Sequence, residues 1–368
     1  MRESVERRRG RIVEAVRSRG MARVAELAEE LEVSAVTVRR DVEHLAQAGR
    51  LRRSYGVVRA AEPVPETPHE GTVSGEAVGL IVPEHHSYLF EAVHGARAVL
   101  EAAGMRLALH IAPHTEHAER TMAERALREG ARGLLVAPRW RSARDERADE
   151  EWLAGLPVPA VLLERRPAAG SPLHAMDSVR SDHWYGTHLA VRHLTALGHR
   201  RIVLAARDDS PTARTVRAAF AAMAEERPEV EGWAVVLSSP DAGPHDRAHD
   251  ASGTPLDLAA VLREHRATAA VLHGDVDALM LVQRLQDGGV RVPGDCSVVA
   301  YDDVVAALGS TPLTAVAPPK DELGRAAAEL LLRRLRHPAG ARPGAVRRIE
   351  LLPELQVRGS TAALTLPE

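Results

Sequence analysis

The sequence predicts an α/β protein in which a small winged helix-turn-helix domain precedes a body of two lobes, each built on a parallel sheet. Three observations support this fold class. Residues 1–60 hold two short amphipathic helical stretches followed by a hairpin-like stretch. From residue 77 onward, short apolar runs alternate with helical stretches, and these units are too many for one open sheet. At 368 residues, the chain is long enough for two or three domains.

The segment at residues 33–45 has the pattern of a recognition helix. Ser34 is a suitable N-cap, because its hydroxyl oxygen can accept from the free N–H groups of the first turn. One face at helical spacing is apolar and carries Val38, Val42 and Leu45. The side chains near the start of the helix and away from that face, which we expect to reach DNA, are Ser34, Val36, Thr37, Arg39 and Arg40.

The neighbouring segments complete the motif. Residues 24–31 form a second short amphipathic helix, which together with residues 33–45 makes a helix-turn-helix. Residues 51–53 and 57–59, joined by a turn at residues 54–56, predict a two-stranded wing. The wing adds Arg52, Arg53 and Tyr55 to the residues expected to contact DNA.

The N-terminal pattern resembles the winged helix-turn-helix of DeoR-type bacterial regulators. The segments that carry the resemblance are Val24-x-Glu26-Leu27-Ala28-Glu29-x-Leu31-x-Val33-Ser34-x-x-Thr37-Val38-Arg39-Arg40-Asp41-Val42-x-x-Leu45 and Gly49-x-Leu51-x-Arg53-x-Tyr55-Gly56. Charge is distributed accordingly: residues 1–60 carry a formal charge of +5 and the remainder −8. A basic head on an acidic body is typical of a DNA-binding module attached to a module with another task. Residues 61–76, with three Pro and two Gly, predict a linker.

In the body we predict eight strands and six helices. The strands lie at residues 78–82, 106–111, 133–136, 160–163, 202–205, 234–237, 270–272 and 297–300, and the helices at 88–103, 116–129, 183–197, 211–225, 256–265 and 275–287. Ligands of such sheets bind at the carboxyl ends of the strands, which for two lobes means the cleft between them.

Several stretches of the body are similar to the effector-binding domain of LacI-type repressors, itself similar to periplasmic sugar-binding proteins. They are Val78-Gly79-Leu80-Ile81-Val82-Pro83, Leu162-Leu163-Glu164-Arg165, Leu197-Gly198-His199-Arg200-Arg201-Ile202, Val292-Pro293-Gly294-Asp295-Cys296-Ser297 with Tyr301-Asp302-Asp303, and Val357-Arg358-Gly359-Ser360-Thr361. The resemblance implies that residues 77–365 form the effector domain, with lobe 1 at about 77–181 and 304–336 and lobe 2 at about 182–303 and 337–365. A Pro-rich linker stands where that family has its hinge helix.

Five residues are candidates for ligand binding. Glu164, Asp275 and Asp302 are acids that end or follow apolar strands, where a carboxylate can accept hydrogen bonds from vicinal hydroxyls, and Arg165 is a donor beside the first of them. The resemblance places these acids at pocket positions and Tyr88 where an aromatic ring stacks on the ligand. The alternative is structural, because acids at strand ends also cap the next helix or pair with a nearby Arg. Val216 and Gly274 stand where the family often has Arg and Asn, which weakens the case for a hexose.

Other classes of protein are disfavoured. The single Cys296 excludes an internal disulfide and a Cys-based zinc site, and His245 and His249 lie in a Pro/Gly/Asp-rich stretch with no third metal ligand. Dinucleotide-binding, phosphate-loop and nucleophile-elbow motifs are absent, so we expect neither cofactor nor catalytic residues. The N-terminus lacks a secretory apolar core and no apolar run approaches the ~20 residues of a membrane span, so we expect a cytoplasmic protein.

The sequence therefore predicts a homodimeric, ligand-responsive transcriptional regulator, a repressor of carbohydrate-metabolism genes. It would bind a double-stranded operator and a small sugar-like effector. Two alternatives stay open. The cleft could belong to an enzyme acting on a sugar or sugar phosphate, or the chain could be a ligand-binding protein with a non-functional DNA head.

Overall fold

The chain divides into two units, residues 1–74 and 75–368, which we describe separately. The computed structural model describes residues 76–84, 88–238, 256–336 and 344–364, together with three strands and some single residues of the N-terminal unit. Within these residues, no helix combines the length and the apolar character needed to cross a membrane.

The N-terminal unit contains the expected wing and buried helix faces. Strands β2 (Leu51–Ser54) and β3 (Val57–Ala60) pair antiparallel, and β1 (Met21–Arg23), which sequence analysis did not predict, pairs with β3. Leu27, Val38 and Val42 are helical and fully buried, as their spacing predicts. The expected DNA-contacting residues Ser34, Val36, Thr37, Arg39, Arg40 and Tyr55 lie outside the described residues, and the side chains of Arg52 and Arg53 are likewise not described.

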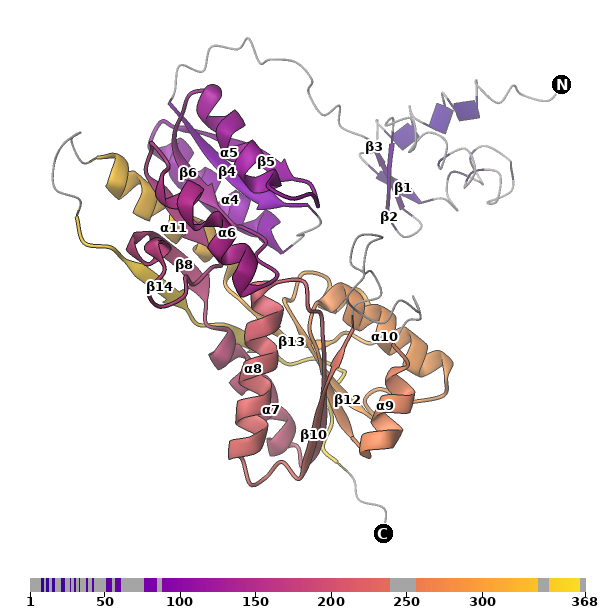
Figure 1. The fold of residues 1–368 in the computed structure, drawn as a ribbon. Helices are drawn as coiled ribbons and strands as arrows, with labels where there is room; N and C mark the ends of the chain where they lie inside the picture. The colour runs from indigo at the N-terminus through magenta and orange to yellow at the C-terminus, as the bar shows by residue number, and fades with distance from the viewer. Residues whose placement is uncertain are drawn as a thin grey trace. The chain divides into compact units, whose positions relative to one another are not determined.

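Lobe 1 is a six-stranded parallel sheet with the order β14-β8-β7-β6-β4-β5 (Figure 1). Its strands are β4 (Ala77–Pro83), β5 (Arg106–Ala112), β6 (Ala131–Val136), β7 (Ala160–Leu163), β8 (Asp177–Ser181) and β14 (Arg348–Leu351). Helices α4 (Leu89–Ala102) and α11 (Lys320–Leu335) contribute to the apolar core on one face, and α5 (Ala118–Arg128) and α6 (Ala143–Ala154) to the core on the other. Every residue of β4 is buried, as its continuous apolar character requires.

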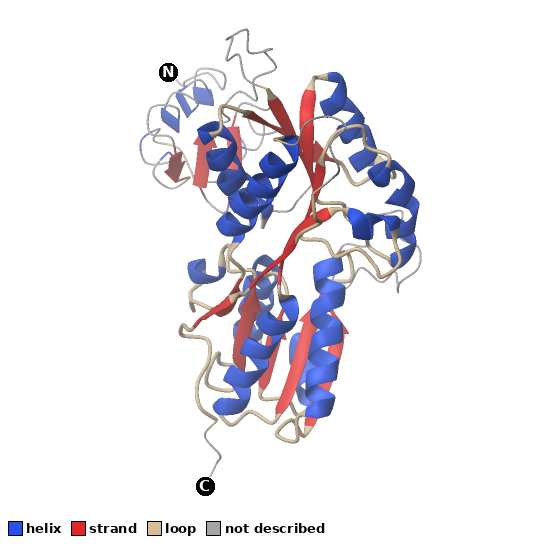
Figure 2. Ribbon diagram, turned by 90° about the vertical axis from the view of Figure 1, so that its left-hand side faces the viewer, coloured by secondary structure: helices blue, strands red, loops and turns tan. Residues whose placement is uncertain are grey.

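Lobe 2 is a second six-stranded sheet with the order β10-β9-β11-β12-β13-β15, parallel except for the edge strand β15. Its strands are β9 (Arg201–Ala206), β10 (Gly232–Leu237), β11 (Ala269–Leu272), β12 (Ser297–Tyr301), β13 (Thr314–Ala317) and β15 (Glu354–Gln356). Helices α7 (His183–Ala196) and α8 (Pro211–Glu226) lie on one face, and α9 (Leu258–His265) and α10 (Asp275–Asp287) on the other. Figure 2 shows helices covering both faces of the two sheets.

The chain passes between the lobes three times. The first passage follows β8 at residue 182, the second lies between β13 and α11 at residues 318–319, and the third lies between β14 and β15 at residues 352–353. The resemblance to LacI-type repressors implied that the second and third passages lie near residues 304 and 337, and both positions are wrong. Strand β13 pairs with β12 and therefore stays in lobe 2, while β14 pairs with β8 and belongs to lobe 1.

Helices α4 and α11 pack closely because each has a glycine where they meet. A Cβ atom on Gly95 would lie 2.0 Å from the backbone oxygen of Asp321, and one on Gly324 would lie 1.9 Å from the backbone oxygen of Ala92. A larger residue at either position would push the helices apart. The close contact between α4 and α11 therefore requires glycine at both positions. It joins α11, which comes late in the chain, to the part of lobe 1 that comes early in the chain.

Candidate ligand-binding cleft

A cavity of about 200 Å³ lies between the two lobes, at the carboxyl ends of their strands. Lobe 1 contributes Glu84, Tyr88, Leu89, His114, Glu164 and Arg165. Lobe 2 contributes Arg207, Asp209, Ser210, Thr212, His273, Gly274, Asp275, Val276, Asp277, Asp302 and Val304. The structure thus brings all five candidates of the sequence analysis to one cavity. A larger cavity of about 370 Å³ between α9 and α10 is mostly apolar and holds none of them.

Backbone geometry at the strand ends turns these side chains toward the cavity. Glu164 follows β7 with φ of 53°, and Asp302 follows β12 with φ of 94°. Positive φ is uncommon for residues other than glycine and is concentrated at functional sites, where the surrounding structure holds it in place. Both residues leave their strands abruptly and begin the loops that line the cleft.

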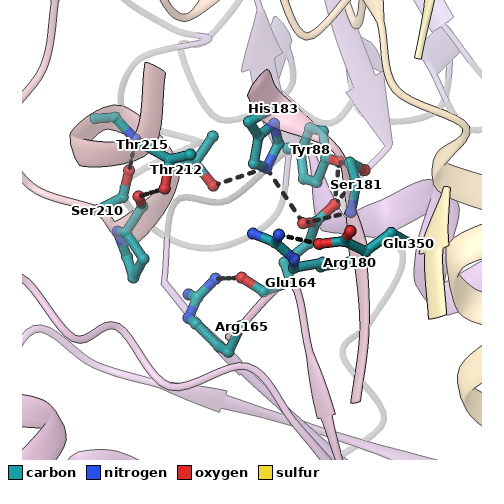
Figure 3. Close-up of polar contacts among 12 residues, drawn as sticks. Tyr88, Glu164, Arg165, Arg180, Ser181, His183, Ser210, Thr212, Thr215 and Glu350 are labelled. Carbon is teal, nitrogen blue, oxygen red and sulfur yellow. Dashed lines mark hydrogen bonds and ion pairs between the residues drawn. The ribbon is translucent and has the colours of Figure 1, made fainter. Parts of the chain in front are cut away.

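Glu164 sits at the centre of a buried network at the back of the cavity (Figure 3). Its Oε1 accepts hydrogen bonds from the Tyr88 hydroxyl at 2.5 Å and the Ser181 hydroxyl at 2.6 Å. Its Oε2 accepts from the Ser181 backbone N–H at 3.1 Å and lies 3.3 Å from Nε2 of His183. Both carboxylate oxygens are therefore occupied by protein groups.

The network also joins the two lobes. His183 begins α7 of lobe 2, and its Nδ1 lies 3.2 Å from the hydroxyl of Tyr301 while its Nε2 lies 3.4 Å from that of Thr212. Burial raises the pKa of Glu164, but the hydrogen bond and charge of His183, with the hydrogen bonds from Ser181 and Tyr88, outweigh it and lower that pKa to about 2. Glu164 is thus ionised, and its contact with His183 links the two lobes behind the cavity.

Asp275 has a structural role at the start of α10. Its Oδ2 accepts from the backbone N–H groups of Val304 and Val305 at 2.5 Å and of Ala306 at 3.0 Å. These bonds hold the loop that follows Asp302. This role differs from both structural alternatives stated above, since Asp275 neither caps the next helix nor pairs with an Arg in the described residues.

Asp302 faces the cavity with its carboxylate uncommitted. It is half-buried, and among the described residues no donor is hydrogen-bonded to its carboxylate oxygens. Its backbone oxygen accepts from Nζ of Lys320, at 2.6 Å. Burial and the negative charge of Asp275 raise the pKa of Asp302 to about 7. The side chain can therefore accept from, or donate to, a ligand hydroxyl near neutral pH.

Arg165 and His273 are the other polar groups with unused capacity. Arg165 is only 3% exposed, and its Nη2 has no hydrogen-bond partner within the described parts of the chain. Neither ring nitrogen of His273 has one there either. Burial and the charge of His183 lower the pKa of His273 to about 3, so its ring is neutral at pH 7.

Sequence reasoning missed several residues of the site. His183, Thr212 and His273 are contributed by lobe 2, and Lys320, the chain's single lysine, lies buried with its Nζ 5.7 Å from the centre of the Tyr88 ring. A signal existed for His273, which directly precedes the Gly274-Asp275 pair at the end of β11. His183 lies next to Glu164 only because the chain passes from lobe 1 to lobe 2 at residue 182. No local sequence pattern predicts that passage.

Known proteins resemble both units of the chain. Residues 8–64 match the DeoR-like helix-turn-helix domain, and residues 191–361 match the periplasmic binding protein-like domain. An arabinose metabolism transcriptional repressor of Geobacillus stearothermophilus is 29% identical over 347 residues, which cover 91% of this chain and 90% of that protein.

Solved structures agree with these matches. A LacI transcriptional regulator from a Rhodococcus species has 25% identity and a TM-score of 0.61, covering 78% of this chain and 99% of that one. A LacI family transcriptional regulator from Enterococcus faecalis, solved with bound ribose, has 25% identity and a TM-score of 0.61, covering 79% and 100%. The chain therefore carries a DeoR-like helix-turn-helix domain and a periplasmic binding protein-like domain over these residues, and the fold of its body is similar to that of LacI-type regulators.

Proposed function

We propose that this protein is a ligand-responsive transcriptional repressor of carbohydrate-metabolism genes, with a sugar as effector. The observation that carries the proposal is the cavity between the lobes, where Asp302, Arg165 and His273 present uncommitted polar groups. A carboxylate, a guanidinium and a neutral imidazole can together accept from and donate to the hydroxyls of a sugar. A volume of about 200 Å³ suits a ligand smaller than the drug-sized ligands of ~300–1,000 Å³ pockets.

The similar proteins support the same assignment. One is named for arabinose metabolism and another was solved with ribose, both pentoses. These names describe repressors and regulators, so we propose a binding role and no catalysis. Chemical conversion of a bound sugar would contradict that part of the proposal.

We infer that the signal reaches DNA through the lobe arrangement. A ligand that binds the closed cleft more tightly than the open cleft shifts the population toward closure. In a homodimer this would change the spacing of two helix-turn-helix units against an operator with two half-sites. Such a regulator works where the chromosome is, in the bacterial cytoplasm.

The test combines ligand binding with operator binding. The purified protein is screened by thermal shift against L-arabinose, D-ribose, hexoses and their phosphates, because a ligand of the native state stabilises it by about 2.7 kcal/mol at a hundred times its Kd. Each ligand that raises Tm is then added to a fluorescence anisotropy titration of operator DNA.

The Asp302→Asn variant should keep operator affinity and lose the ligand response. The matched control is Asp287→Asn, an exposed acid at the end of α10. A normal ligand response in Asp302→Asn would show that the effector binds elsewhere, and the absence of any stabilising sugar would contradict the sugar assignment.

A further inference from the structure

We propose that the cleft is built for a sugar carrying an anionic group, a phosphoryl or a carboxylate, held between Arg165 of lobe 1 and the first turn of α8 in lobe 2. This inference rests on the proposed function and names the class of its effector. It follows from which charged groups around the cavity already have partners and which do not.

The carboxylates around the cavity are largely engaged by the protein itself. Glu164 is bound by Tyr88, Ser181 and His183, and Asp275 by three backbone N–H groups. Arg207 serves two more acids, because its Nε lies 3.1 Å from Oδ2 of Asp209 and its Nη1 lies 3.5 Å from Oδ2 of Asp277. Asp302 has an uncommitted carboxylate, which suits a ligand hydroxyl.

Two guanidinium groups, in contrast, each have a buried nitrogen to spare: that of the buried Arg165, which lines the cavity, and that of the half-buried Arg214, which is near Arg165 but not in the cavity lining. Arg165 donates from Nε to the backbone oxygen of Pro138 and from Nη1 to that of Glu164 at 2.8 Å. Its Nη2 has no hydrogen-bond partner among the described residues. Nη1 of Arg214, in the first turn of α8, is also buried without a hydrogen-bond partner in the described part of the chain. A buried donor on a charged group without an acceptor is costly, so an acceptor from a ligand is expected at each.

The start of α8 adds a third favourable element. This helix has 16 residues, and two residues at its start, Ser210 and Thr212, line the same cavity as Arg165. Ser210 caps the helix by accepting from the Ala213 backbone N–H at 3.1 Å (Figure 3 shows both Ser210 and Thr212). The dipole of α8 favours negative charge at this end; Pro211 has no N–H and the Ala213 N–H is bound by Ser210, so among residues 211–213 it is Thr212 whose N–H is left for an anion.

Electrostatics within the protein agree with this placement. Burial lowers the pKa of Arg165 to about 10; the carboxylates of Glu164 and Glu119 oppose the change, and the positive charge of Arg214 adds to it. Burial also lowers the pKa of Arg217; the charges of Asp208 and Asp209 oppose the change and the charge of Arg214 adds to it. An anion placed between positive charges in a buried region offsets their mutual repulsion and so stabilises their charged forms.

The experiment compares matched pairs of sugars by isothermal titration calorimetry on the full-length protein. The pairs are D-ribose and D-ribose 5-phosphate, D-glucose and D-glucose 6-phosphate, and D-galactose and D-galacturonate. In at least one pair we expect the anionic member to bind ten or more times as tightly as the neutral one. The Arg214→Gln variant should abolish this preference while keeping the affinity for the neutral member.

Arg165 requires a milder change, because two of its nitrogens bind backbone oxygens. Arg165→Lys keeps the charge but loses the planar fork that binds an anion through two N–H groups, so the preference should fall several-fold. The matched control is Arg291→Gln, an exposed guanidinium paired with Asp295, which should leave the preference unchanged. Tm values of all three variants confirm that each is folded.

The outcomes separate this inference from the proposed function. If neutral sugars bind and change operator affinity while their anionic partners bind no more tightly, the anionic subsite is wrong and the sugar-responsive repressor stands. A preference that persists in both Arg214→Gln and Arg165→Lys also overturns the subsite. If no member of any pair binds, the anionic subsite is wrong, and the proposed function is then decided by the thermal-shift screen, which also contains L-arabinose.

Discussion

Asp302 combines a positive φ, a place in the cavity and an uncommitted carboxylate. Its raised pKa, about 7 against about 3.9 in an unfolded chain, means that ionisation opposes folding. The stability contributed by the protonated form is complete below pH 4 and is lost as the pH rises to 7. Ionised Asp302 thus lowers the free energy of unfolding at neutral pH.

A measurement of the free energy of unfolding can detect this loss of stability. Asp302→Asn removes the ionisation, so it should stabilise the unliganded protein at pH 8 by as much as ~4 kcal/mol and have little effect at pH 4. Urea unfolding of the variant and of the wild type at pH 4, 6 and 8 measures the difference. A difference that stays constant with pH would mean that the Asp302 carboxyl titrates as it does in an unfolded chain.

The chemistry of single residues explains what sequence reasoning could find in the site. Acids after apolar strands, such as Asp302, are conspicuous, because a charge seldom follows a buried strand without a reason. Their tasks are less visible: Asp275 holds a loop 29 residues away in sequence, and Glu164 is bound by a histidine from the other lobe. Which oxygen stays free depends on partners that only the folded chain brings near.

At the scale of elements, the close packing of α4 against α11 makes a sharp prediction. Gly324→Ala places a methyl group against the backbone of α4, where no side-chain rotation can relieve the contact. We expect a loss of about 3 kcal/mol or more in the free energy of unfolding, measured by urea denaturation.

Gly288→Ala is the matched control for this change. Gly288 follows α10 with an ordinary backbone conformation, and a Cβ atom there would lie 3.4 Å from the nearest atoms. Its effect should stay within about 1 kcal/mol. Equal losses in the two variants would show that the helix pair tolerates separation.

Apolar patterning also accounts for which elements were predictable. All eight strands predicted in the body are present, because each reads as a short apolar run; most are buried, whereas β5 and β10 are only partly buried. Strand β8 was missed because its sequence, which begins with Asp177, is not an apolar run. The buried carboxylate of Asp177 accepts hydrogen bonds from Arg333 and Arg334. Helices α6 and α11 were not predicted either: α6 buries only Glu146 and Leu153 and so has no apolar stripe, whereas α11 has a clear one.

At the scale of the whole molecule, the two units should carry separable functions. Arg40→Ala should abolish the preference for operator over random DNA, because Arg40 is expected to face away from the buried helix side that holds Val38 and Val42. In the same variant, a bound sugar should raise Tm by as much as it does in the wild type. Competition anisotropy with operator and random duplexes measures the first property, and thermal shift the second.

An unchanged operator preference in Arg40→Ala would mean that another face of the helix reads the bases. Arg291→Gln again serves as the matched control, since it removes one exposed positive charge from the body. The comparison distinguishes a base contact from a general loss of charge.

The threefold passage of the chain between lobes has a consequence for synthesis on the ribosome. Helix α4 presents Leu89, Ala92, Val93, Ala96 and Leu100 to a core that α11 completes. The roughly 220 residues between these helices take on the order of 10–40 s to translate. During that time the growing chain holds an unfinished apolar surface, and lobe 2 is almost fully made before lobe 1 can close. A nascent chain halted before residue 320 therefore has no finished first lobe, and we expect such fragments to need chaperones or to be degraded.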